Sequence, residues 1–211
     1  MKVTLNRVSV FAVLAGVLSF SFLLAALATD FWYQIDAPGL EKFTNQTGSF
    51  KSHRGLWRTC QFNSTCLPIV NPFKSKTANM TTSRKNVLYL HGTFVVLLPL
   101  SLIIIVFGGM AGVLSISTQA FCLLLLTGVL FLLGALVTLL GVSIYIAYSA
   151  ALFKHVASFR GRKNLMENLD IQIGWSLAFA WVSIGTELLT GLAFILMAKM
   201  VDQKRRWDNF I

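Results

Sequence analysis

Four long stretches of this chain are almost free of charge, and each is long enough to cross a lipid bilayer. They cover residues 8–28, 87–114, 120–147 and 175–198. A helix needs about 20 apolar residues to span the hydrocarbon core, so each stretch is a candidate transmembrane helix. Of the 211 residues, 55% are hydrophobic and 12% are charged, which leaves little sequence for a soluble domain. The sequence therefore predicts an all-α transmembrane bundle of four helices.

The first apolar stretch allows a second interpretation, because Ala26-Leu27-Ala28 has the form of a signal-peptidase site. Its apolar core is about 21 residues long, however, whereas signal peptides usually have about 7–15. We therefore expect a retained helix and a single membrane domain over 1–211. The expected parts are helices over 8–28, 87–114, 120–150 and 175–198, loops over 29–86 and 151–174, and a tail over 199–211.

Loop 29–86 carries three N-glycosylation sequons, which begin at Asn45, Asn63 and Asn79. Glycosylation of such sites belongs to the secretory route, so the sequons place this loop outside the cell. Asn45 and Asn79 lie in polar stretches with room for a glycan. Asn63 lies between two cysteines, so we expect it to be occupied less often.

The distribution of basic residues gives conflicting information about orientation. The two loops hold twelve of the eighteen Lys and Arg, and the terminal segments hold six, which by simple counting would place the loops in the cytosol. Charges beside the first helix usually have the largest effect on membrane orientation. Two basic residues, Lys2 and Arg7, precede that helix, whereas residues 29–36 after it contain two acids and no base. We expect cytosolic termini in a multi-pass plasma-membrane protein. The net charge of +10 is divided between both sides and does not indicate nucleic-acid binding.

Cys60 and Cys66 are the only cysteines outside the apolar stretches. They could form a disulfide or contribute to a metal site. A closed zinc site needs four ligands, and only His53 is near these cysteines in the sequence. We therefore expect a disulfide that fixes the register of a hairpin, and no metal or other cofactor.

A tryptophan follows the first apolar stretch, and a short motif with two cysteines follows it in turn: Trp32, then Gly55, Leu56, Trp57, Cys60 and Cys66. Together with the four apolar stretches, these residues resemble the signature of the claudin superfamily, which also holds the peripheral-myelin-protein and epithelial-membrane-protein group and the calcium-channel gamma subunits. Finer similarity over 29–33, 91–94, 98–101 and 143–149 looks like the transmembrane protein 114 group.

The resemblance implies a left-handed four-helix bundle capped by a small extracellular antiparallel sheet, with most strands from the first loop and one from the second. Residues 31–36 and 54–62 are rich in β-forming side chains, and 169–173 alternate apolar and polar, which agrees. Two features depart from the claudin pattern. Only five residues separate Cys60 from Cys66, which is shorter than in claudins, and Arg84 is the nearest candidate for the arginine that often ends the first loop.

Trp32 and Trp57 have two interpretations. Tryptophans near the ends of spanning helices are often anchors at the membrane interface. The resemblance instead implies that both pack on the buried face of the sheet, and we favour this packing because Trp57 lies three residues from Cys60.

Glu187 is the only acid deep inside an apolar stretch, where a charge costs about 2.5–3.5 kcal/mol on insertion scales. Such a residue can belong to an ion or proton route. The other three stretches contain no charged partner for a relay. We therefore favour a structural role, in which Glu187 is protonated or hydrogen-bonded to Ser, Thr or Tyr of a neighbouring helix.

The chain lacks the motifs of membrane enzymes, so we expect no catalytic activity. Two function classes remain, both based on the resemblance. One is a cell-surface or junction-associated interaction protein, and the other is an auxiliary, gamma-like subunit of an ion channel. The expected partners are membrane lipid and membrane proteins. Small-residue pairs such as Ala12/Gly16 and Gly108/Gly112 suit packing within the bundle and leave homo-oligomers open.

Overall fold

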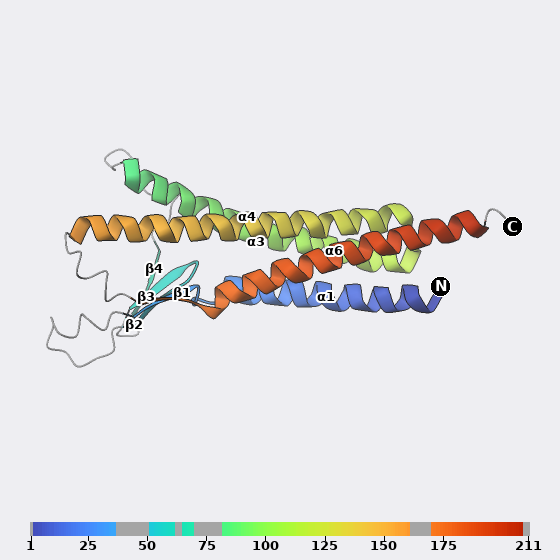
Figure 1. Cartoon of the computed structure of the whole chain (residues 1–211), viewed down its shortest axis with the longest axis horizontal. Helices are drawn as coiled ribbons and strands as arrows, with labels where there is room; N and C mark the ends of the chain where they lie inside the picture. The colour runs from blue at the N-terminus through green and yellow to red at the C-terminus, as the bar shows by residue number, and fades with distance from the viewer. Residues whose placement is uncertain (1, 37–50, 62–64, 70–81, 161–169, 209–211) are drawn as a thin grey trace. The chain divides into compact units, whose positions relative to one another are not determined.

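The computed structural model describes residues 2–36, 51–61, 65–69, 82–160 and 170–208, and these contain four long helices and a five-stranded sheet (Figure 1). The helices are α1 (Lys2–Ala28), α3 (Thr82–Thr118), α4 (Phe121–Arg160) and α6 (Trp175–Asp208). Each contains a stretch that is long and apolar enough to cross a membrane. The predicted architecture of four spanning helices with a small sheet is confirmed.

All four helices extend beyond the apolar stretches that predict them, and α1 begins at Lys2 instead of residue 8. α3 begins at Thr82 and α4 continues to Arg160, into the segment expected to be a loop. α6 continues through the expected tail to Asp208. Apolar runs mark only the part of a helix that lies in lipid. Lys, Arg, Met and Gln are good helix formers, so a helix can continue through such residues into water.

The five strands are β1 (Tyr33–Asp36), β2 (Lys51–Arg54), β3 (Arg58–Gln61), β4 (Thr65–Pro68) and β5 (Asp170–Ile173). They form one antiparallel sheet in the order β4-β3-β2-β1-β5. Four strands come from the segment between α1 and α3, and β5 directly precedes α6, as expected. The predicted extended stretch 54–62 is interrupted by a turn, in which the Gly55 N–H donates to the Arg58 carbonyl at 2.9 Å.

The chain folds into two compact units. Unit 1 contains Met1–Leu24, Leu97–Leu139 and Ala180–Ile211, and unit 2 contains Ala25–Val96 and Leu140–Phe179. The sheet belongs to unit 2. Each of the four helices contributes one stretch to each unit.

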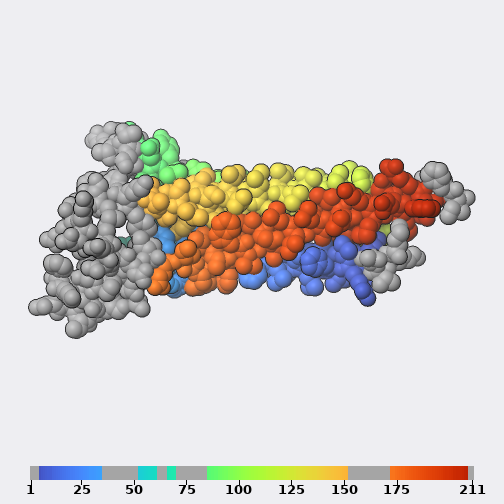
Figure 2. Space-filling view, in the orientation of Figure 1, coloured from blue at the N-terminus to red at the C-terminus, as the bar shows by residue number. Residues whose placement is uncertain are grey.

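In unit 1, small residues let helices approach closely. A Cβ added to Gly128 of α4 would lie 3.0 Å from the carbonyl oxygen of Gly191 in α6, and the Phe131 ring covers Gly108 of α3. Figure 2 shows α6 against α1 in this unit, where the Ser183 hydroxyl donates to the Ser19 carbonyl at 2.9 Å. Large apolar side chains cover the outer helix faces, as expected where lipid is the solvent.

Candidate functional site

Two tryptophan side chains cap the carboxyl end of α1 in unit 2. The last carbonyl groups of a helix have no partner within the helix. Here the Trp32 indole Nε1 donates to the Ala26 carbonyl at 2.9 Å, and the Trp57 indole Nε1 donates to the Leu27 carbonyl at 2.9 Å. A carbonyl left unsatisfied near hydrocarbon costs several kcal/mol, so these bonds stabilise the point where the chain leaves the membrane.

The two tryptophans differ in burial. Trp32 is fully buried, and its ring lies 4.6 Å from that of Tyr145, centroid to centroid. Trp57 is 44% exposed, so the expectation that it packs on the buried face of the sheet is wrong. Trp57 lies in the bend that precedes β3, outside the strand, and its indole reaches the end of α1. Trp57 is therefore partly exposed beside the carboxyl end of α1.

The segment that follows α1 packs closely against two glycines, Gly55 and Gly174. A Cβ on Gly55 would collide with the backbone and side chain of Asp30, and a Cβ on Gly174 would collide with the Phe31 carbonyl group. The Gly174 N–H donates to the Trp32 carbonyl at 3.0 Å. Gly55 belongs to the recognised motif, whereas the sequence gives no sign that Gly174 has a matching role.

Cys60 of β3 and Cys66 of β4 form a disulfide, as predicted. The two cysteines lie directly opposite each other in the antiparallel register. Pairing continues past the strands, because the Ile69 N–H donates to the Trp57 carbonyl at 3.0 Å. The disulfide therefore fixes the register of the β3–β4 hairpin.

One face of this hairpin carries two exposed apolar side chains, Trp57 and Leu67. The register places Thr59 opposite Leu67, and Trp57 lies opposite Ile69. Cross-strand partners project to the same face of a sheet. Leu67 is 57% exposed. We call Trp57, Thr59, Leu67 and Ile69 the hairpin face.

The sheet is attached to α4 through an arginine that sequence reasoning missed. Arg54, the last residue of β2, donates from Nη2 to the Tyr148 hydroxyl at 2.6 Å, and its guanidinium carbon lies 5.5 Å from the centre of that ring. The rings of His91 and Phe94 in α3 pack against the same tyrosine in tilted orientations. In β1, burial raises the pKa of Tyr33, and the Arg54 guanidinium offsets part of that rise.

Glu187 lies in unit 1, fully buried between helices. Its Oε1 is 2.7 Å from the Ser183 hydroxyl, and its Oε2 is 3.2 Å from the Thr138 hydroxyl of α4. Each hydroxyl also lies 2.9 Å from a backbone carbonyl, Ser19 for Ser183 and Gly134 for Thr138. A hydroxyl has one proton to donate, so two hydroxyls cannot serve all four acceptors.

The sequence was compared with models of known protein families, and one model matches most of the chain. The family model described as PMP-22/EMP/MP20/Claudin tight junction matches residues 17–196. The chain belongs to this family. The match includes the capped end of α1, the glycine and tryptophan motif and the disulfide.

Family membership and the four spanning helices make this claudin-family chain a multi-pass membrane protein. The family also points to a non-enzymatic role. In the described part of the chain, no three His, Cys, Asp or Glu side chains gather where they could hold a metal ion. His53, near the cysteines in sequence, stacks instead on Phe31, with ring centres 4.4 Å apart.

Some predicted site residues of this claudin-family chain cannot be placed. The sequon residues Asn45, Asn63 and Asn79 lie outside the described residues. The side chain of Arg84, in the first turn of α3, also lies outside them. The structure therefore brings together the tryptophans, glycine and cysteines of the motif at one place, and it places Glu187 in the other unit.

Proposed function

We propose that this claudin-family chain is a plasma-membrane glycoprotein that binds another membrane protein through its hairpin face. In this proposal the termini are cytosolic, the sheet lies outside the cell, and Asn45 and Asn79 carry glycans. The single observation that carries the proposal is the exposed Leu67 beside the exposed Trp57 on a disulfide-linked hairpin.

The hairpin face has the properties of a binding surface. Tryptophan is enriched among the residues that contribute most to protein interfaces. The disulfide and the Trp57 hydrogen bond to Leu27 hold the face in place before a partner arrives. Such preorganisation lowers the entropy cost of association.

The position of Trp57 favours a partner in the same membrane. Its indole donates to the end of α1, where the apolar stretch meets water. A partner that contacts this side chain has to reach the level of the lipid head groups. A neighbouring junction protein meets this condition, and so does the pore subunit of an ion channel, for which this chain would act as a gamma-like auxiliary subunit.

We assign the chain first to the cell-surface and junction-associated class, with membership of the transmembrane protein 114 group as the finer proposal. The loops carry a net charge of +7, from twelve basic and five acidic residues, which suits an acidic partner surface. The short disulfide loop argues against a pore surface of the claudin type.

Proximity labelling in a polarised epithelial cell tests the proposal. The full chain carries a labelling enzyme in its first loop and is compared with Leu67→Glu and Ile173→Glu. Leu67 and Ile173 lie on the two edge strands, β4 and β5, and are 57% and 78% exposed. The second variant therefore matches the first in charge and exposure but lies away from the hairpin face.

Enrichment of junction proteins supports the first class, and enrichment of channel pore subunits supports the second. In either case Leu67→Glu should lose the partner, whereas Ile173→Glu should retain it. Retention of the same partners by both variants, at equal surface levels, would rule out the hairpin face as the binding surface.

A further inference from the structure

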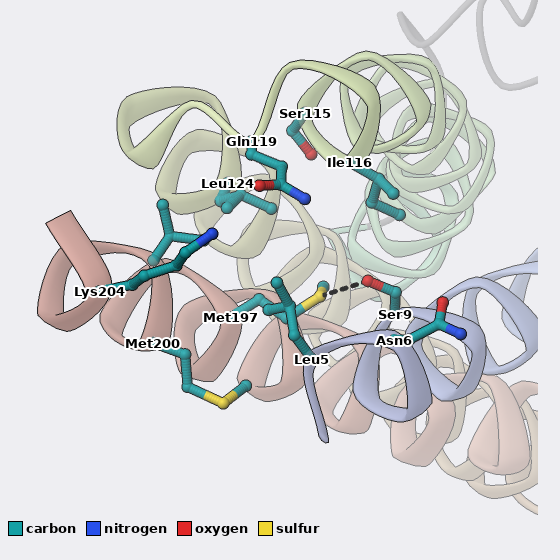
Figure 3. A pocket seen from close by; sticks show the side chains of 11 residues that line it. Leu5, Asn6, Ser9, Ser115, Ile116, Gln119, Leu124, Met197, Met200 and Lys204 are labelled. Atoms are coloured by element: carbon teal, nitrogen blue, oxygen red, sulfur yellow. Dashed lines mark hydrogen bonds between the residues drawn. The ribbon is translucent and has the colours of Figure 1, made fainter. Parts of the chain in front are cut away.

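A cavity lies in unit 1 where α3 ends, α4 begins and α6 passes the first turns of α1 (Figure 3). It encloses about 540 Å³. Ligand pockets usually measure about 300–1,000 Å³ and combine an apolar lining with a few polar groups. The cavity is therefore large enough for a small molecule or for part of a lipid.

The lining has two chemical parts. Six apolar residues line it: Leu5, Ile116, Leu124, Met197, Met200 and Val201. The polar residues are Asn6, Ser9, Ser115, Gln119 and Lys204. The Ser115 hydroxyl already donates to the Gly112 carbonyl at 2.8 Å, and Ser9 donates to the Met197 sulfur at 3.2 Å. Asn6, Gln119 and Lys204 thus supply the polar chemistry directed at a ligand.

The cavity lies at the depth of lipid head groups. The apolar stretch of α6 ends at Ala198, and charged residues begin with Lys199. Arg7 precedes the apolar stretch of α1 in the same way. A ligand here would have apolar atoms next to hydrocarbon and polar atoms next to water.

The charge around the cavity is positive. Figure 3 shows the Lys204 side chain extending toward Gln119, whose carbonyl accepts from Arg205 Nη2 at 3.4 Å. Asp202 pairs with Arg206 at 3.1 Å, so this acid is already compensated. Among the residues at this end of unit 1 whose side chains the structure describes, there are five cations and two acids: Arg7, Lys199, Lys204, Arg205 and Arg206 against Asp202 and Asp208. The ligand should therefore be an anion.

We propose that this cavity binds one anionic glycerophospholipid. Its phosphate-bearing head group lies at Lys204 and Gln119, and one acyl chain lies along Ile116, Leu124 and Val201. The two-part lining and the positive edge match a molecule with an anionic head and an apolar tail. The proposal does not depend on the partner of the hairpin face.

The test uses the full chain purified in detergent and stripped of lipid. Binding of dioleoyl phosphatidylserine and dioleoyl phosphatidylcholine is measured by native mass spectrometry, and the thermal midpoint without lipid serves as the folding control. We expect a preference for phosphatidylserine that Lys204→Gln reduces about fivefold, since one Lys near a membrane surface contributes about that factor. Lys199→Gln removes an equal charge outside the cavity lining and should leave most of the preference.

A second variant tests the acyl chain. Ile116→Phe fills part of the apolar lining without changing charge, and it should weaken binding of both lipids. Glycerol 3-phosphate, which has the anionic group without acyl chains, should not bind measurably at the same concentration.

Three results would overturn the proposal. Equal losses in Lys199→Gln and Lys204→Gln would indicate a diffuse surface potential. Unchanged binding of both lipids to Ile116→Phe would place the acyl chain elsewhere, and saturable binding of glycerol 3-phosphate would make the site one for a soluble anion. If Ile116→Phe does not fold, the comparison of Lys199→Gln with Lys204→Gln by itself tests whether the lipid binds in the cavity.

Discussion

The indole Nε1 of Trp57 donates a hydrogen bond to the carbonyl oxygen of Leu27, at 2.9 Å, so the β3–β4 hairpin closes the end of the first spanning helix. Trp32 does the same for the preceding carbonyl, that of Ala26. The motif tryptophans therefore do more than fill space. They supply donors to helix carbonyls that would otherwise lack partners where the chain leaves the lipid.

Replacing Trp57 by Phe tests this capping. The ring is retained but the N–H donor is lost, so we expect a loss of about 1 kcal/mol in the free energy of unfolding. Thermal unfolding of the purified chain in detergent measures the change. Trp181→Phe is the matched control, because Trp181 of α6 is 47% exposed. Equal effects of the two substitutions would mean that the hydrogen bond to Leu27 contributes nothing.

Gly55 and Gly174 should not tolerate a methyl group. The added Cβ would meet backbone atoms of Asp30 and Phe31, which cannot move aside as a flexible side chain can. We expect each Gly→Ala change to cost about 1–3 kcal/mol, the usual range for overpacking, and to lower surface expression. Gly185→Ala is the control, since a Cβ there meets nothing within 4 Å. A stable Gly174→Ala variant would show that the segment after α1 can shift freely.

The disulfide should matter for delivery more than for global stability. The chain-entropy model gives about 2 kcal/mol for so short a loop. We expect Cys60→Ser and Cys66→Ser to reduce the amount of protein at the cell surface, measured by surface biotinylation. Cys122→Ser, which removes a free and exposed thiol, should have no effect. Normal delivery of both disulfide variants would contradict a role for the cross-link in forming the hairpin.

Glu187 should tolerate an amide. Glu187→Gln keeps the shape and provides a neutral donor to the Ser183 and Thr138 hydroxyls, so thermal stability should stay close to that of the unsubstituted chain. Glu187→Leu removes those partners and should cost about 1–3 kcal/mol. A double-mutant cycle with Thr138→Val measures the coupling. Destabilisation by Gln as large as that by Leu would instead indicate that a charged carboxylate is required.

The sequence predicts the four spanning helices because lipid imposes a simple rule on length and polarity. It predicts their ends poorly. α4 continues to Arg160 and α6 to Asp208, where no apolar run remains and helix propensity decides the extent. The sheet is predicted in outline from β-forming residues, whereas the turn at Gly55 that separates β2 from β3 is not.

The sequence predicts some features of the candidate site and not others, because local sequence shows only some of the contacts. The disulfide follows from the number and spacing of cysteines. The exposure of Trp57 is not predicted, because Trp57 lies in a bend outside β3, where closeness to Cys60 in the sequence does not fix the direction of its side chain. The bond between Arg54 and Tyr148 joins residues 94 positions apart, and nothing in either local sequence indicates it. Such pairings arise only when the sheet and helices are assembled.

The most direct test of the proposed orientation uses two epitopes in intact cells. One is inserted beside Lys76 in the first loop, and the other follows Ile211. We predict that antibodies label the loop epitope without permeabilisation and reach the terminal epitope only after it, because the proposed orientation places the sheet outside the cell and the termini in the cytosol. Labelling of the terminal epitope alone in intact cells would contradict this orientation and, with it, the proposal that the hairpin face binds a partner at the cell surface.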